Sequence, residues 1–210
     1  MDYGYILNEW KEQNHENLFR LILENENSDL NQTGGNWSSE MKKLKTLLQT
    51  SVPFNYIDFT KENVEKLGNC ITTPIENVYL DNIGKETLFD KMKRKRGGRG
   101  DIDRRLFIDA IPKVLSNPAF IIEHIPTRVD EYICHLYFKK VNLQVKEGNS
   151  QKSEYTLMFV VFLKNPAYPK LISFYNVDIF KRIFVGDTIL YEGGQQVQVK
   201  LTKTNSEPTN

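Results

Sequence analysis

Basic residues gather in one short stretch of the chain, KMKRKRGGRGDIDRR at positions 91–105, and they are suited to holding an anion. Eight of these fifteen residues are Lys or Arg, and three are glycines, which let the backbone approach a ligand closely. Asp103 can cap the next helix, so that the free amide groups of its first turn face the same place. This stretch, which we call the basic run, indicates a phosphate-binding site; a solvated turn or a nuclear import signal is the alternative interpretation.

Two histidines could serve in acid–base chemistry, because they fall on expected strands that are neighbours along the chain. His124 lies near the end of a β-rich stretch. His135 alternates with the apolar residues of the next such stretch and so shares a face with Tyr137 and Lys139. His15 lies among polar residues and is expected to be exposed. A lone histidine on a strand is more often structural than catalytic, so both interpretations stay open for His124 and His135.

The chain has no pattern that indicates a metal or a cofactor. HExxH, paired His–Cys spacing and carboxylate clusters are absent, as are GxSxG and the P-loop. Cys70 and Cys134 are far apart, which gives no disulfide framework and favours reduced thiols in a cytosol-like compartment. Metal-free chemistry on a polyanion stays open, because it needs only cations and an acid–base pair. We therefore expect no metal and no cofactor.

The composition is that of a soluble globular protein. The 210 residues carry a formal net charge of +1, with 40% hydrophobic and 26% charged residues, so attraction for nucleic acid must come from a local patch. The N-terminus lacks a basic region followed by an apolar run, and no window approaches the length of a membrane span. We expect no membrane association and a cytoplasmic location, in the producing cell or in a target cell.

Helical periodicity dominates the first part of the chain. We expect residues 1–68 to form a helical N-terminal segment, in which Thr60 and Gly68 begin and end a short helix, KENVEKL. A longer amphipathic helix is expected at 103–117, and Pro112 should kink or split it.

Strand patterns dominate the chain after this helix, with short polar connections between them. The domain is expected to span residues 69–193, and 194–210 to form a disordered tail. The order of elements predicts an α+β fold, in which N-terminal helices precede a four- to five-stranded antiparallel sheet. The expected strands are 119–125, 131–140, 155–164, 170–177 and 188–193, and NVYL at 77–80 is a candidate for a further short strand.

The segment DRRLFIDAIPKVLSNPAFIIEH, followed by DEYICHLYFKK, YTLMFVVFLK and LISFYNVDIFKR, resembles a phage-associated nuclease family. This family is grouped with barnase, EndoU, the tRNA-cleaving colicins and RelE. The resemblance covers about 77–193. The matching positions are Leu106, Ile111, Pro112, Leu115, Pro118, Tyr132, Ile133, Ser173 and Phe174.

The resemblance implies an RNase-like fold and a metal-independent ribonuclease, such as a tRNA- or mRNA-cleaving toxin or effector of a phage or mobile element. RNA is then the substrate, and an immunity or antitoxin protein is a candidate partner. In this chemistry the ribose 2′-OH attacks the adjacent phosphate, while a base, an acid and nearby cations assist. The implied phosphate-binding residues are Lys93, Arg94, Lys95, Arg96, Arg99, Arg104 and Arg105. The implied catalytic residues are His124, Arg128, His135 and Lys139, with Ser173 and Tyr175 to hydrogen-bond the nucleotide.

Two alternatives use the same residues without catalysis. A binding module would hold nucleic acid or an acidic partner on the basic surface, and a structural protein of a mobile element would leave that surface merely solvated. Whether His124 or His135 faces the basic run separates these alternatives from the enzyme.

Overall fold

The computed structural model describes residues 36–55, 57, 60–80, 107–125, 133–144, 154–163, 167–179 and 182–202. Within these residues strands predominate: nine of them form one mixed sheet, accompanied by three helices. The helices are α3 (Asn36–Leu47), α4 (Lys61–Glu65) and α6 (Ala110–Ser116). The strands are β1 (Val52–Asn55), β2 (Cys70–Thr72), β3 (Asn77–Tyr79), β4 (Phe120–His124), β5 (Cys134–Gln144), β6 (Glu154–Phe162), β7 (Lys170–Asn176), β8 (Thr188–Glu192) and β9 (Gln195–Lys200). None of the helices within the described ranges is long and apolar enough to cross a membrane.

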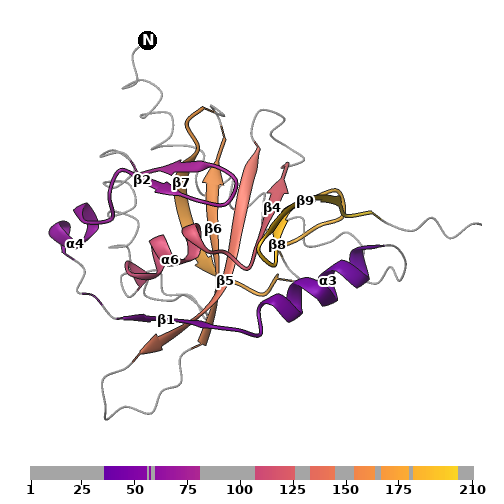
Figure 1. Cartoon of the computed structure of the whole chain (residues 1–210), viewed down its shortest axis with the longest axis horizontal. Coiled ribbons are helices and arrows are strands. Elements are labelled where there is room, and N and C mark those ends of the chain that lie inside the picture. The colour runs from indigo at the N-terminus through magenta and orange to yellow at the C-terminus, as the bar shows by residue number, and fades with distance from the viewer. Residues whose placement is uncertain are drawn as a thin grey trace, which may run out of the picture.

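The sheet is built around β5, its longest strand (Figure 1). The strand order is β2-β3-β7-β6-β5-β4-β8-β9, and β1 pairs with the far half of β5. Strands β7, β6, β5 and β4 are antiparallel neighbours, as their alternating patterns and short connections indicate. The pairs β1–β5 and β3–β7 are parallel.

The prediction of N-terminal helices followed by a four- to five-stranded antiparallel sheet is wrong. The structure has a curled, mixed sheet of nine strands that forms a half-barrel. Strand β1 lies within the segment expected to be helical, and β2 and β3 extend the sheet beyond β7. Strand β3 falls in NVYL, the candidate short strand, whereas β1 and β2 have only four and three residues and carry too few side chains to show a strand period.

The tail prediction is also wrong for Gln195–Lys200, which form β9 and pair with β8. Gly193 and Gly194 make the two-residue turn between these strands, with φ of 55° and 93°. Two consecutive positive φ values suit a hairpin turn, and glycine adopts them without strain.

The helices agree in part with the sequence. Thr60 caps α4 by accepting a hydrogen bond from the Asn63 amide, and Gly68, with φ of 78°, follows the helix end. The expected helix at 103–117 is described only from residue 107, and its α-helical part begins at Ala110. Pro112 therefore lies in the first turn, where a backbone N–H has no helical acceptor, and it does not kink the helix.

Each face of the sheet carries its own apolar cluster. At the two ends of the strand order, the side-chain amide of Gln196 in β9 donates to the carbonyl oxygen of Pro74 in the β2–β3 turn, at 2.6 Å. We call the face over which these ends meet the inner face. It is covered by α6 and includes Phe54, Ile111, Leu115, Ile121, Tyr137, Phe159 and Phe174.

The opposite, outer face is covered by α3 and includes Met41, Leu44, Phe120, Ile122, Leu136, Phe138, Met158 and Val160. Helix α3 is also held to the strands by polar contacts. Lys43 pairs with Glu192 of β8, and the Asn36 side chain bonds to the backbone of Lys200 and Thr202 at 2.8 and 2.7 Å. Helix α3 and strand β1, both within the expected helical N-terminal segment, thus pack on the same sheet as the strands of 69–193.

Candidate active site

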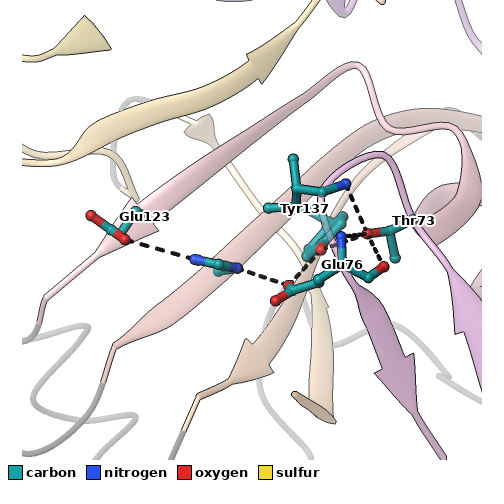
Figure 2. A network of polar contacts seen from close by, with 6 residues as sticks. Thr73, Glu76, Glu123 and Tyr137 are labelled. Atoms are coloured by element: carbon teal, nitrogen blue, oxygen red, sulfur yellow. Dashed lines mark hydrogen bonds and ion pairs between the residues drawn. The ribbon is translucent and has the colours of Figure 1, made fainter. Parts of the chain in front are cut away.

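A polar network interrupts the apolar inner face at one end of the strands (Figure 2). The Nδ1 atom of His135 lies 2.8 Å from Oε1 of Glu76, and the Tyr137 phenol donates to the same oxygen at 2.6 Å. On the other side of the imidazole ring, Nε2 of His135 lies 3.8 Å from Oε2 of Glu123. The network therefore places one histidine between two carboxylates.

Strand register explains why these side chains meet. His135 and Tyr137 are two residues apart on β5 and so point to the same face. Glu123 of β4 is the cross-strand partner of His135, which puts its side chain beside the imidazole ring. The third group, Glu76, comes from the β2–β3 turn.

The β2–β3 turn is shaped by Thr73. Its hydroxyl oxygen accepts from the Glu76 amide at 3.1 Å, and its own amide donates to the Glu76 carbonyl at 2.9 Å. A threonine side chain that hydrogen-bonds to the backbone of its own turn takes the place of backbone–backbone hydrogen bonds and fixes the conformation of the loop. The Thr73 hydroxyl also lies 3.0 Å from the Tyr137 phenol. The turn is thereby tied to β5, and Glu76 is held against the histidine.

Exposure differs across the network. The side chains of His135 and Glu76 are 10% and 12% exposed, whereas that of Glu123 is 29% exposed. Burial raises the pKa of Tyr137, and the Glu76 carboxylate raises it further, so the phenol stays protonated and donates its hydrogen bond. With Nδ1 directed to Glu76, the Nε2 atom is the histidine nitrogen that faces Glu123 and the more open side.

His124 belongs to a different environment, on the outer face. Its Nδ1 atom lies 2.7 Å from Oδ1 of Asp187, and both side chains are 5% exposed. The second oxygen of Asp187 accepts from the Phe184 amide at 2.8 Å, and the Phe184 ring packs beside the imidazole. The structure therefore does not bring His124 and His135 together, because adjacent strands direct them to opposite faces.

Cys134 is the cross-strand partner of His124 and lies in the outer-face cluster. Burial raises the pKa of its thiol to about 12. The thiolate is the nucleophilic form, so this buried cysteine is suited to packing and not to nucleophilic catalysis.

Lys139 follows Tyr137 on the inner-face side of β5 and is half-buried. Burial lowers the pKa of its ammonium group. Within the described ranges, no carboxylate pairs with it. It lies four positions after His135, which is roughly 13 Å along a strand, so the two groups cannot contact one phosphate.

Of the other predicted residues, Ser173 and Tyr175 lie on β7. The backbone register pairs Ser173 with Val160 and Tyr175 with Met158, and these partners belong to the outer-face cluster. Arg128 and the whole phosphate-binding set, Lys93, Arg94, Lys95, Arg96, Arg99, Arg104 and Arg105, lie outside the described residues.

Sequence reasoning missed both carboxylates of the network. Glu123 carries a signal, since it is the single charged residue of the strand FIIEH and a charge on a buried strand needs a partner. Glu76 follows Thr-Pro-Ile, a turn sequence, but only the tertiary fold places that turn beside β5.

Comparison of the chain with protein-family models, with curated proteins and with solved structures finds no match. Among the side chains that the structure describes, no group of three or more His, Cys, Asp or Glu is arranged to hold a metal ion.

Proposed function

We propose that the chain is an endoribonuclease that cleaves RNA by metal-independent transesterification, with Glu123 and His135 as its base and acid. The observation that carries the proposal is the position of His135 between two carboxylates, 2.8 Å from Glu76 at Nδ1 and 3.8 Å from Glu123 at Nε2. A buried carboxylate on Nδ1 and a second titratable group near Nε2 form the arrangement that acid–base catalysis requires.

The proposed reaction has two proton transfers. Glu123, the more exposed carboxylate, takes the proton of the ribose 2′-OH, whose oxygen then bonds to the adjacent phosphorus. The bond between phosphorus and the 5′-oxygen breaks, and His135 gives the proton on Nε2 to that oxygen. The products are a 2′,3′-cyclic phosphate and a 5′-hydroxyl end. A positioned acid or base is worth about 100- to 10,000-fold in rate.

Three residues have positioning roles in this scheme. Glu76 fixes the orientation of the His135 ring through Nδ1, as the third member of a triad does. Tyr137 and Thr73 hold Glu76 and its turn in place. Because all three are mostly buried and hydrogen-bonded to one another, the acid–base pair is oriented before substrate binds.

Cations complete the proposed site. Lys139 would hold a phosphate at a distance from the cleaved one, and its half-buried position favours pairing with an anion. The basic run at 91–105 would supply further phosphate contacts. The sequence resemblance supports a tRNA- or mRNA-cleaving effector of a phage or mobile element, whose partner is an immunity or antitoxin protein.

Incubation of the purified protein with total RNA in EDTA tests the proposal. The parent should cleave RNA and leave cyclic phosphate ends, His135→Ala should abolish cleavage, and His124→Ala should keep it at a temperature where circular dichroism shows both variants folded. If the parent binds RNA but cleaves no member of a broad RNA panel in either EDTA or magnesium, the ribonuclease is excluded. The protein is then a nucleic-acid-binding module. If His135→Ala cleaves at the parent's rate, the assignment of the acid is wrong.

A further inference from the structure

Two tyrosines form a stack where β3 pairs with β7, separate from the acid–base network. The rings of Tyr79 and Tyr168 lie nearly parallel, with centroids 4.0 Å apart and 14° between their planes. Tyr168 is 46% exposed, although it is a large aromatic residue. The Lys170 ammonium lies 6.0 Å from the centre of the Tyr168 ring. An exposed aromatic ring with a cation over it therefore lies at the start of β7.

The backbone keeps this surface in a fixed orientation. The Tyr79 amide donates to the Pro169 carbonyl at 2.8 Å, and Tyr79 is the parallel-strand partner of Lys170. The chain directly after Tyr168 is thus tied to β3. Stacking on Tyr79 further restricts the Tyr168 ring, so a ligand that stacks there has little side-chain entropy to remove.

We infer that Tyr168, supported by Tyr79 and Lys170, is a stacking site for a base of single-stranded RNA. A nucleobase fits this surface because it presents a π-face to the ring, while the phosphate next to it carries the charge that Lys170 attracts. The inference rests on the proposed function in taking RNA as the ligand, but it assigns a binding role that needs no cleavage.

The position of the stack relates it to the acid–base network. Tyr79 is the last residue of β3, Lys170 is the first of β7 and His135 is the second of β5, and the strand pairings place all three at the same end of the sheet. Two strand spacings separate β5 from β7, which is roughly 10 Å. The cross-strand partner of Lys170 is Phe162, an outer-face residue, so an RNA strand must pass around these strand ends to reach both sites.

Binding of a 2′-O-methyl oligonucleotide tests the inference, because this RNA analogue has no 2′-OH nucleophile and cannot be cleaved by the proposed reaction. Affinity is measured by fluorescence anisotropy, and stacking by the quenching of 2-aminopurine placed at each position in turn. Tyr168→Ala should weaken binding roughly 5- to 150-fold and remove the quenching at one position. Tyr168→Phe, which keeps the ring, should retain both.

Two controls separate stacking from general apolar contact. Tyr168→Leu keeps apolar surface without a π-face and should behave like Tyr168→Ala, whereas Ile125→Ala removes another exposed apolar side chain and should bind like the parent. The inference is overturned if Tyr168→Leu or Tyr168→Ala binds like the parent, or if the parent does not bind. Tyrosine-dependent binding by a protein that leaves natural RNA intact would support this inference while excluding the ribonuclease. If the protein cleaves natural RNA but Tyr168→Ala binds the oligonucleotide like the parent, the ribonuclease is supported and the stacking site is excluded.

Discussion

His124 and His135 sit on adjacent strands, and each bonds through Nδ1 to a carboxylate, at 2.7 and 2.8 Å, yet only one of them lies in an arrangement suited to chemistry. His124 and Asp187 are each 5% exposed, and the remaining oxygen of Asp187 is used by a backbone amide. His135 has a second carboxylate, Glu123, near its other nitrogen, and that carboxylate is 29% exposed. A histidine–carboxylate pair alone therefore does not identify a catalytic site. The proposed site rests on the second, accessible titratable group near His135.

The difference arises from a single step along β4. Glu123 and His124 are consecutive residues of one strand, so their side chains point to opposite faces of the sheet. Glu123 reaches the inner face and meets His135, its partner on β5, while His124 reaches the outer face and meets Asp187. A shift of one residue in this register would exchange the two environments.

The largest expected effect compares the same chemical change in the two pairs. Glu123→Gln should lower kcat for RNA cleavage about 100- to 10,000-fold, because the amide cannot accept the 2′-OH proton. Asp187→Asn should leave kcat at the parent value, since the outer pair takes no part in the reaction. Single-turnover cleavage of a defined RNA measures both. Equal losses in the two variants would show that the inner pair has no special role.

For the free energy of unfolding, the outer-face pair should matter more than the inner-face pair, the opposite of the order expected for cleavage. His124→Ala leaves Asp187 buried without its partner, and breaking a buried pair in this way costs about 3 kcal/mol in the free energy of unfolding. His135→Ala should cost less, about 1 kcal/mol, because Glu76 keeps the hydrogen bond from Tyr137 and water can reach Glu123. Urea unfolding followed by circular dichroism measures both values. A larger loss for His135→Ala would mean that the inner network is chiefly structural.

The sequence predicts the central strands and the shared face of His135, Tyr137 and Lys139, because long strands show their period of two. It does not predict that His124 and His135 face apart, since that depends on the register between two strands. It also misses Glu76, which only the pairing of β3 with β7 brings to β5. Strands of three or four residues are held by tertiary pairing, and their local sequence carries little of that information.

A smaller effect is expected within the inner network. Tyr137→Phe removes the hydroxyl that donates to Glu76, and Thr73 loses a polar neighbour at the same time. The free energy of unfolding should fall by about 1 kcal/mol, the usual net worth of a hydrogen bond. Cleavage should persist, because His135 still bonds to Glu76. The matched control is Tyr155→Phe, a partly buried tyrosine of the same cluster. A loss of cleavage as large as that of Glu123→Gln would make Tyr137 a direct participant.

The smallest expected effect on stability concerns Lys139 and Lys140. They are consecutive residues of β5, so their side chains also point to opposite faces of the sheet. Lys140 pairs with Glu154 at 2.6 Å, whereas burial lowers the pKa of Lys139 below its ordinary value of 10.5. The folded protein thus disfavours the charged form of Lys139. Between the lowered pKa and 10.5 the unfolded chain binds more protons, so the free energy of unfolding rises with pH in that window.

Lys139→Met keeps the aliphatic stem and removes the buried ammonium, so it should stabilise the protein at neutral pH and flatten this rise. The gain over the parent should shrink as the pH approaches 10.5, where the lysine is losing its proton in both states. Lys140→Met removes an ion pair that is partly open to water, so it should cost less than about 1 kcal/mol and give no gain at neutral pH. Urea unfolding at a series of pH values measures these differences. If Lys139→Met is less stable than the parent at neutral pH, an anionic group pairs with the Lys139 ammonium in the folded protein. That ion pair then offsets the cost of burying the charge.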